Sequence, residues 1–186
     1  MKSLKKYIAL SAILISLNGF AQVYVGGKIS STSTAVSLEF ENGNRGIIVP
    51  WVDDAATVDN TANTILGTPS GAGAVTGTII YDTADRSMKV KTNTGWKDLS
   101  VDETGVVDTS LQSGLSDRPN AKTSVGTPGN TPGILVLEAT DKAMVLPKVA
   151  SPHENIVQPA PGMMVYDTTT KQLAVFNGTV WTFWKP

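Results

Sequence analysis

The chain has 186 residues with 15 Lys and Arg against 16 Asp and Glu, a net charge of −1, and only 17% of its residues are charged. Nucleic acids and anionic membrane surfaces bind basic surfaces, so this balance excludes both as main partners. The chain has no cysteine, which excludes disulfides, thiolate metal sites and a lipid-modified cysteine. With 17 Gly, 10 Pro and abundant Thr, Ser and Val, the composition is typical of a turn-rich, mainly β protein.

The first 21 residues have the pattern of a secretory signal peptide. A basic start with three lysines among its first six residues precedes an apolar run over 7–17. Gly19 and Ala21 place small residues at the −3 and −1 positions, which predicts cleavage after Ala21. The run is shorter than the roughly 20 residues that cross a bilayer, so we expect no membrane span. We expect export to the extracellular space, to the cell surface in association with the outer membrane, or to the periplasm. The mature chain would carry 15 − 3 = 12 basic and 16 acidic residues, a net charge of −4.

A repeat organises the rest of the sequence. The run G-I-I-V-P ending at Pro50 recurs as A-M-V-L-P ending at Pro147, an offset of 147 − 50 = 97. The run G-T-I-I-Y-D-T recurs as G-M-M-V-Y-D-T at an offset of 162 − 77 = 85, so one copy carries a 12-residue insertion. Such self-similarity predicts two copies of one β module. The repeated positions are Pro50, Gly77, Tyr81, Asp82 and Trp96 in the first copy, and Pro147, Gly162, Tyr166, Asp167 and Trp181 in the second.

Each module is predicted to begin as a hairpin. Apolar and polar residues alternate strictly over 36–41, which predicts a strand with one buried face. A short turn then leads to a strand over 47–49, which ends at Pro50 because proline lacks the ladder donor. Residues 135–138 and 144–146 take these places in the second module. We therefore expect a mainly β chain with a signal peptide at 1–21, a first module at 22–99, an extended Gly/Pro/Thr-rich linker at 100–133 and a second module at 134–186.

A short helix is predicted after each proline. The run Ser-Pro-His-Glu at 151–154 has the spacing of a capping box with proline at the first helical position, and Pro159 would stop that helix. In the first module Asp53 or Asp54 can cap a weak helix over 55–66. A Gly/Pro-rich loop then runs to Gly77 and holds the insertion.

A three-stranded antiparallel meander is predicted to close each module. Asn177-Gly178 is a type I′ turn signal between the last two strands of the second meander. So few strands cannot cover an apolar face, so we expect the modules to bury these faces against each other or against sister chains. The predicted strands are 78–81, 87–91 and 96–99, then 163–166, 172–176 and 179–183, and the predicted apolar face of the second meander is Met163, Val165, Leu173, Val175 and Trp181.

This motif order resembles a repeat of secreted or surface proteins of Bacteroidota-type Gram-negative bacteria and of phage tail fibres. The first copy departs from the pattern, since Trp51 replaces the usual basic residue and 91–93 replace aromatic-Asn-Gly. The resemblance implies a structural spacer or adhesin part, often oligomeric, with a homotrimer as the expected assembly and without catalytic residues or cofactors. The matching runs of the second copy are 145–149, 159–162, 166–168 and 176–181.

Nothing in the sequence favours catalysis. His153 is the only histidine and lies in a predicted helix start, and no serine has the G-x-S-x-G setting of a hydrolase. The acidic pairs Asp53/Asp54 and Asp82/Asp85 could be weighed as calcium ligands, but Asp82 and Asp167 stand at equivalent turn starts, where aspartate bonds nearby amides. Asn177-Gly178-Thr179 has the N-glycosylation pattern, but the predicted Asn-Gly hairpin explains it without glycosylation.

The four tryptophans divide into two pairs. Trp96 and Trp181 occupy repeated positions and are expected to pack on their own meanders. Trp51 and Trp184 lie outside the repeat and are the candidates for an exposed contact surface. The sequence therefore predicts a noncatalytic, exported structural or adhesin-like protein that acts through protein contacts, as an oligomer or as an accessory subunit of a larger surface assembly. The alternative is a carbohydrate-binding module that uses Trp51 and Trp184.

Overall fold

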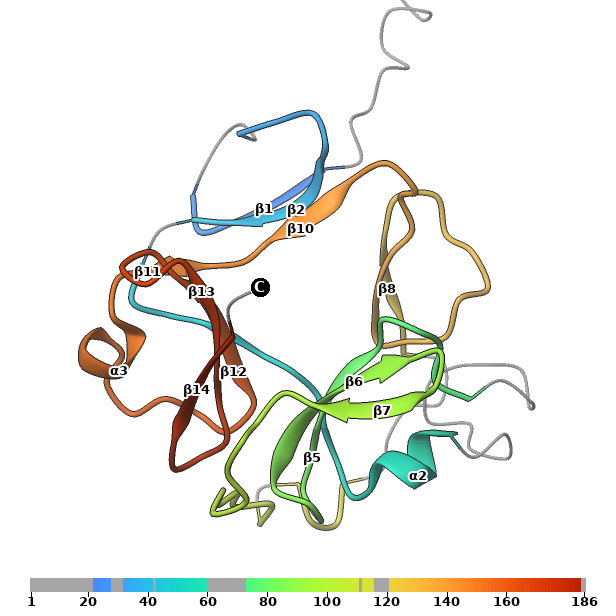
Figure 1. Ribbon diagram of the computed structural model, residues 1–186. Helices are drawn as coiled ribbons and strands as arrows, with labels where there is room; N and C mark the ends of the chain where they lie inside the picture. The colour runs from blue at the N-terminus through green and yellow to red at the C-terminus, as the bar shows by residue number, and fades with distance from the viewer. Residues whose placement is uncertain are drawn as a thin grey trace, which may run out of the picture.

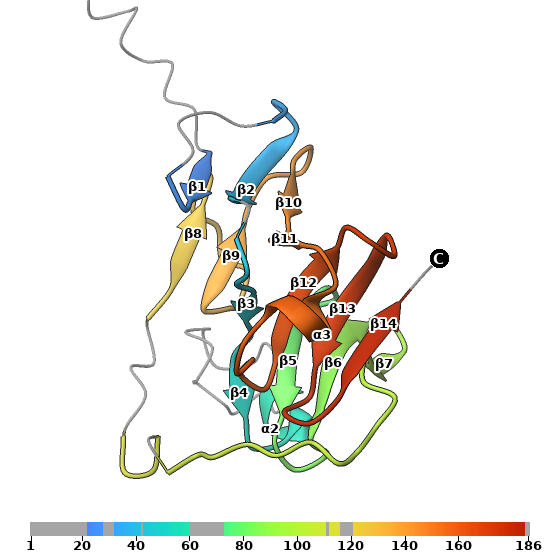
Figure 2. The same ribbon diagram turned by 90° about the vertical axis from the view of Figure 1, so that its left-hand side faces the viewer.

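The computed structural model describes residues 22–27, 32–41, 43–59, 73–110, 112–115 and 121–184. The described chain is mainly β, as predicted, and forms four sheets (Figure 1). A four-stranded and a five-stranded sheet make the packed body, and two small parallel sheets lie apart from it (Figure 2). The predicted signal peptide lies outside the described residues, and no described helix is long and apolar enough to cross a membrane.

The four-stranded sheet has the order β4-β5-β6-β7. Strand β4 is parallel to β5, and β5, β6 and β7 form the predicted antiparallel meander. Helix α2 begins after Asp54, whose carboxylate accepts the N–H of Ala56 at 2.7 Å, so Asp54 and not Asp53 caps it. The remainder of the predicted helix lies outside the described residues. The bounds are β4 Trp51–Val52, α2 Ala55–Asp59, β5 Ile79–Asp82, β6 Ser87–Thr92 and β7 Gly95–Asp98.

The five-stranded sheet has the order β11-β12-β13-β14, and β3 pairs with β12 as well. Strand β11 is parallel to β12 at Tyr166 and Asp167, whereas β3 is antiparallel to β12 at Met163 and Met164. A strand from the N-terminal half therefore completes the sheet of the C-terminal half. The bounds are β3 Ile47–Ile48, β11 Lys148–Val149, β12 Met163–Asp167, β13 Gln172–Phe176 and β14 Trp181–Trp184.

The two sheets match in register at the offsets found in the sequence. Trp51 is opposite Tyr81 in one sheet, and Lys148 is opposite Tyr166 in the other. The Tyr81 N–H donates to the Pro50 carbonyl, and the Tyr166 N–H donates to the Pro147 carbonyl, at 2.9 Å in both cases. The exact module boundaries stay a prediction.

Helix α3, Pro152–Asn155, differs from the predicted capping box. Pro152 is its first residue, as expected, but Ser151 is left-handed with φ 43° and makes no side-chain cap. Instead the Ser151 N–H donates to the Asp167 carboxylate at 3.0 Å, and its hydroxyl bonds the Thr169 hydroxyl at 3.2 Å. The capping-box prediction is wrong because the neighbouring strand end competes for the serine.

The predicted opening hairpins are also wrong. Strand β2, Val36–Phe40, pairs in parallel with β1, Val23–Val25, and with β10, Ala143–Val145. Strand β9, Leu135–Leu137, pairs in parallel with β8, Thr123–Val125. Neither β2 with β3 nor β9 with β10 forms a pair, because β3 pairs with β12 and β10 with β2. Local alternation predicts a strand, but it does not predict its partner.

The packed body is layered helix, sheet, sheet, helix. An inner core joins the two large sheets and contains Tyr81 and Met88 from one sheet with Met164 and Val175 from the other. Outer cores lie beneath α2 and beneath α3, and Val165 is in the latter. Both faces of the five-stranded sheet are thus buried, which corrects the single predicted apolar face. Met163, Val165 and Trp181 lie in the α3 core, whereas Leu173 and Val175 lie in the inner core.

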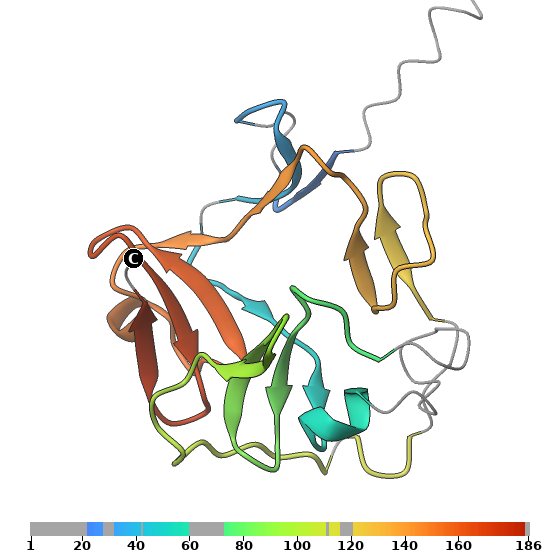
Figure 3. The ribbon, with the colours of Figure 1, turned by 45° about the vertical axis from the view of Figure 1, so that its right-hand side comes forward.

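The first part of the predicted linker lies against both large sheets. The segment from 99 to 110 runs along their lower ends (Figure 3). The Asn177 side-chain amide donates to the Asp102 carbonyl at 2.9 Å, and the Thr179 hydroxyl donates to the Thr104 carbonyl at 2.9 Å. Gly105 lies so deep that a Cβ there would come within 2.3 Å of the Asn177 carbonyl oxygen. Later in the same stretch, residues 123–125 form β8.

The turn at Asn177 is not the predicted type I′ turn. That type needs a positive φ at both Asn177 and Gly178, and only Gly178 has one, 102°. The Asn177 side-chain oxygen accepts the N–H groups of Thr179 and Val180 at 2.9 and 2.7 Å. Asn177 is completely buried, so the hairpin and not glycosylation accounts for this motif.

Candidate functional site

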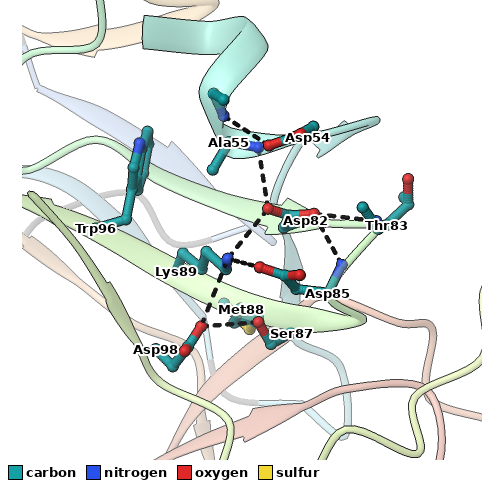
Figure 4. Close-up of polar contacts among 12 residues, drawn as sticks. Asp54, Ala55, Asp82, Thr83, Asp85, Ser87, Met88, Lys89, Trp96 and Asp98 are labelled. Atoms are coloured by element: carbon teal, nitrogen blue, oxygen red, sulfur yellow. Dashed lines mark hydrogen bonds and ion pairs between the residues drawn. The ribbon is translucent and has the colours of Figure 1, made fainter.

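The densest polar cluster of the described chain surrounds Asp82 at the end of β5 (Figure 4). Its carboxylate accepts the N–H of Ala55 at 2.9 Å and that of Ala84 at 3.0 Å. The Lys89 ammonium lies 3.2 Å from the same carboxylate and also bonds Asp85. Asp82 and Lys89 are buried, with 1% and 8% of their surface exposed. The cluster therefore ties α2, the β5–β6 turn and β6 together.

Both charges of this cluster are stabilised. Burial alone would raise the pKa of Asp82, but hydrogen bonds from the amides of Asp85 and Ala55, together with Lys89, hold it below its ordinary value. Burial alone would lower the pKa of Lys89, yet its bonds to Asp85 and Asp82 raise it. A general acid or base needs a pKa near the working pH, and these shifts move both groups away from it. The cluster is a structural ion pair.

A polar pocket of about 440 Å³ lies beside this cluster. It is lined by Asp85, Arg86, Asp98 and Glu103 among others. Among the described residues, no buried side-chain polar atom lacks a hydrogen-bond partner, and no group of three His, Asp or Glu residues is placed to hold a metal ion. The described acidic residues that were weighed as calcium ligands are not part of such a group.

Asp167 has the same role in the other large sheet. Its carboxylate accepts the N–H of Thr169 at 2.8 Å and the hydroxyl of Thr170 at 2.6 Å. Burial would raise its pKa, but these bonds and the Ser151 amide lower it. The turn interpretation of Asp82 and Asp167 agrees with these contacts.

Trp51 and Trp184 are half-buried rather than exposed. The Trp51 indole N–H donates to the Pro161 carbonyl at 2.8 Å, which links the first module to the second. The Trp184 indole N–H donates to the Leu99 carbonyl, and the Lys97 ammonium lies 5.3 Å from the Trp184 ring centre. Both indole groups form hydrogen bonds within the chain, because each lies where the two large sheets meet.

Trp96 and Trp181 pack on the outer faces of their sheets, beneath α2 and α3 respectively. The Trp96 indole N–H donates to the Asp59 carboxylate at 3.0 Å. Trp181 lies 5.2 Å from Phe176, measured between ring centres. Each of these two tryptophans thus belongs to the outer core of its own sheet.

Two further repeated positions, Tyr81 and Gly162, meet at the contact between the sheets. The buried Tyr81 hydroxyl donates to the Asn177 carbonyl at 2.7 Å. A Cβ on Gly162 would lie 3.1 Å from Tyr81 and 3.3 Å from the Trp51 indole nitrogen, so only glycine fits comfortably here. Its positive φ of 76° favours glycine as well. Gly77 differs, because a Cβ there would meet nothing.

His153 has no catalytic setting. Its side chain is 49% exposed and lies 3.7 Å from the Glu154 carboxylate and 5.8 Å, between ring centres, from Phe183. No described serine or aspartate forms a hydrogen bond to it in the structure. The described chain thus offers no triad at its only histidine.

Some of the exposed apolar side chains lie on or next to the small parallel sheets, a surface that the sequence alone did not indicate. Val23 and Val25 of β1 are 40% and 46% exposed, and Leu135 of β9 is 50% exposed, next to Ile134 at 46%. Parallel strands are normally buried on both faces, and a two-stranded sheet is marginal in water. These strands are therefore the best candidate for a surface that another chain covers. Their exposure depends on which partner each strand takes, and the sequence gives no signal for that.

Comparison with known proteins agrees with such a surface. Residues 119–185 match the model of a family described as the phage tail like trimerisation region. The match spans the chain from β8 to β14 and supports the resemblance to tail fibres, whereas the resemblance to Bacteroidota surface repeats stays a prediction. No curated protein and no solved structure matches the chain. Over these residues the chain is thus similar to a trimerisation region of phage tail-like proteins.

Proposed function

We propose that this chain is a homotrimeric structural subunit of an extracellular or cell-surface assembly, where it presents or spaces an adhesin-like partner. The observation that carries the proposal is the match to a trimerisation region over residues 119–185. The exposed apolar residues of β1 and β9 support it, because such surface on small parallel sheets favours association.

The test is the mass of the native particle. The chain should be expressed with its own N-terminus, isolated from the exported fraction and measured by light scattering over a dilution series. We expect a particle of about three chain masses that persists on dilution. A stable monomer would overturn the proposal.

Export is part of the proposal and needs its own measurement. N-terminal sequencing of the isolated protein should begin at Gln22, and Leu14→Arg within the apolar run should leave the chain in the cytoplasm. An unprocessed N-terminus on the exported protein would contradict the predicted cleavage.

The partner can be identified by affinity purification from the envelope fraction. A single large protein in fixed ratio to the chain is the expected result. Glycan-array binding that disappears in Trp51→Ala would instead favour the carbohydrate-binding alternative.

A further inference from the structure

The two small parallel sheets are built on the same pattern. At the offset of 97, Leu38 of β2 corresponds to Leu135 of β9. Leu38 is opposite Val23 of β1, and Leu135 is opposite Thr123 of β8, so the two pairs share one register. The two pairs also end with matching hydrogen bonds. The Glu41 N–H donates to the Val25 carbonyl at 2.9 Å, and the Glu138 N–H donates to the Val125 carbonyl at 3.0 Å.

The pairs differ at their second edge. Strand β2 carries β10 there, with Met144 opposite Leu38 and Val145 opposite Glu39. Strand β9 carries no further strand among the described residues. One edge of the C-terminal pair is thus open where its counterpart is filled.

Within the described part of the chain, the outer edge of β9 has backbone groups without a strand partner. The Ile134 carbonyl and the Glu138 N–H both bond β8. Successive residues of a parallel strand bond to opposite sides, so Leu135 and Leu137 direct their N–H and carbonyl groups away from β8. Such an edge is a template for another strand.

We propose that the open edge of β9 binds strand β3 of a second copy of this chain, in parallel and in the register that β10 has on β2. Strand β3 is the counterpart of β10, because Ile47 and Ile48 correspond to Met144 and Val145 at the offset of 97. The same offset then places Ile47 of the second copy opposite Leu135 and Ile48 of the second copy opposite Val136.

Strand β3 is suited to this role. One of its edges pairs with β12, and no other described strand pairs with it. The Ile48 side chain is 52% exposed, similar to Leu135 at 50%. Covering both would bury apolar surface that a secreted chain would otherwise leave in water.

The contact joins different surfaces of two copies, so each copy both donates β3 and accepts it on β9. Head-to-tail contacts of this kind close into a ring when the rotation from one copy to the next closes, and form a filament when it does not. The number three comes from the matched trimerisation region, which contains β9, so the inference rests on the proposed function.

Cysteine cross-linking tests the pairing directly, since the chain has no cysteine of its own. Residues directly opposite on neighbouring strands lie within the range that a disulfide spans. Ile47→Cys combined with Leu135→Cys should, after mild oxidation, give covalent dimers and trimers on a non-reducing gel. The control combines Ile47→Cys with Val157→Cys, at a side chain that is 85% exposed, and should stay monomeric on the gel.

The outcomes separate the inference from the proposed function. A particle that is trimeric by light scattering but does not cross-link would overturn the β3–β9 pairing and leave the trimer standing. A cross-link within one chain would overturn the pairing as well. A monomeric wild-type protein would overturn both.

A proline variant provides a second, independent measurement. Leu135→Pro removes the outward N–H without removing a bond to β8, so we expect loss of the trimer with the β signal in circular dichroism retained. Val157→Pro is the matched control, because Ile156 before it is extended (φ −98°, ψ 113°) and tolerates a following proline. A trimer that survives Leu135→Pro would contradict the proposal, and a failure of Leu135→Pro to fold leaves the decision to the cross-link.

Discussion

Single residues decide how tightly the chain segments approach one another. Gly105 is the clearest case, since a Cβ there would lie 2.3 Å from the Asn177 carbonyl oxygen and 2.6 Å from that of Arg86. Both obstacles are backbone atoms, which cannot move aside as a flexible side chain can. Residues 101–107 can lie against both sheets because Gly105 has no side chain.

Gly105→Ala should therefore destabilise the protein by about 1–3 kcal/mol through overpacking. The measurement is the urea midpoint of unfolding. Gly43→Ala is the control, because a Cβ at Gly43 meets nothing within 4 Å, and it should change stability by less than about 0.5 kcal/mol. Equal midpoints for the two variants would contradict the close approach described for Gly105.

Asp82 links stability to pH. Its pKa in the folded chain is lowered, so it contributes stability that is present above the unfolded pKa of about 3.9 and is lost as the pH falls through the folded value. Asp82→Asn should be less stable than wild type at pH 7, and the difference should shrink below about pH 4.

Unfolding by urea at pH 7, 5 and 3 measures this difference. Asp53→Asn, at an exposed side chain next to α2, should follow the wild type at each pH. A difference between Asp82→Asn and wild type that is constant across the three pH values would show that the carboxylate charge is not involved.

The elements of the packed body are short, and their stability comes from burial on both faces of the large sheets. Strand β12 alternates between the α3 core, which holds Met163 and Val165, and the inner core, which holds Met164. No single face of this strand is left for solvent. A charge on either face therefore has no route to water.

Val165→Asp should prevent stable folding, because Val165 is completely buried and an unpaired charge there costs several kcal/mol. Val157→Asp makes the same chemical change at a side chain that is 85% exposed and should leave stability within about 0.5 kcal/mol of wild type. Circular dichroism measures whether each variant folds, and thermal melting compares the stability of the two variants with that of wild type. Cooperative melting of Val165→Asp near the wild-type temperature would refute the two-sided core.

At the scale of the whole molecule, the halves of the chain are interlocked rather than strung on a linker. Strand β3 pairs with β12, and β10 pairs with β2, so each half donates a strand to a sheet of the other. The inner core and the Trp51 to Pro161 hydrogen bond add to this contact.

Cutting the chain between its halves should therefore not separate them. A specific protease site inserted at the exposed Gly114 should give two fragments on a denaturing gel but one particle of unchanged size by gel filtration. Separation of the fragments under native conditions would contradict the interlocked arrangement.

The sequence by itself determined the local features of this protein. Alternation and turn chemistry indicated the meander strands and the turns at Asp82 and Asp167, because these features depend on one short segment. It also predicted that the meanders could not stand alone.

Only the tertiary structure decided which strands are neighbours. Strand β2 takes β1 and β10 instead of β3, β3 pairs with β12, and one edge of β9 has no partner strand among the described residues. Backbone groups are the same in every strand, so a strand's own residues do not specify its partner. The partner is set by which faces can be buried together once the whole chain has folded, and the interaction surface follows from that choice.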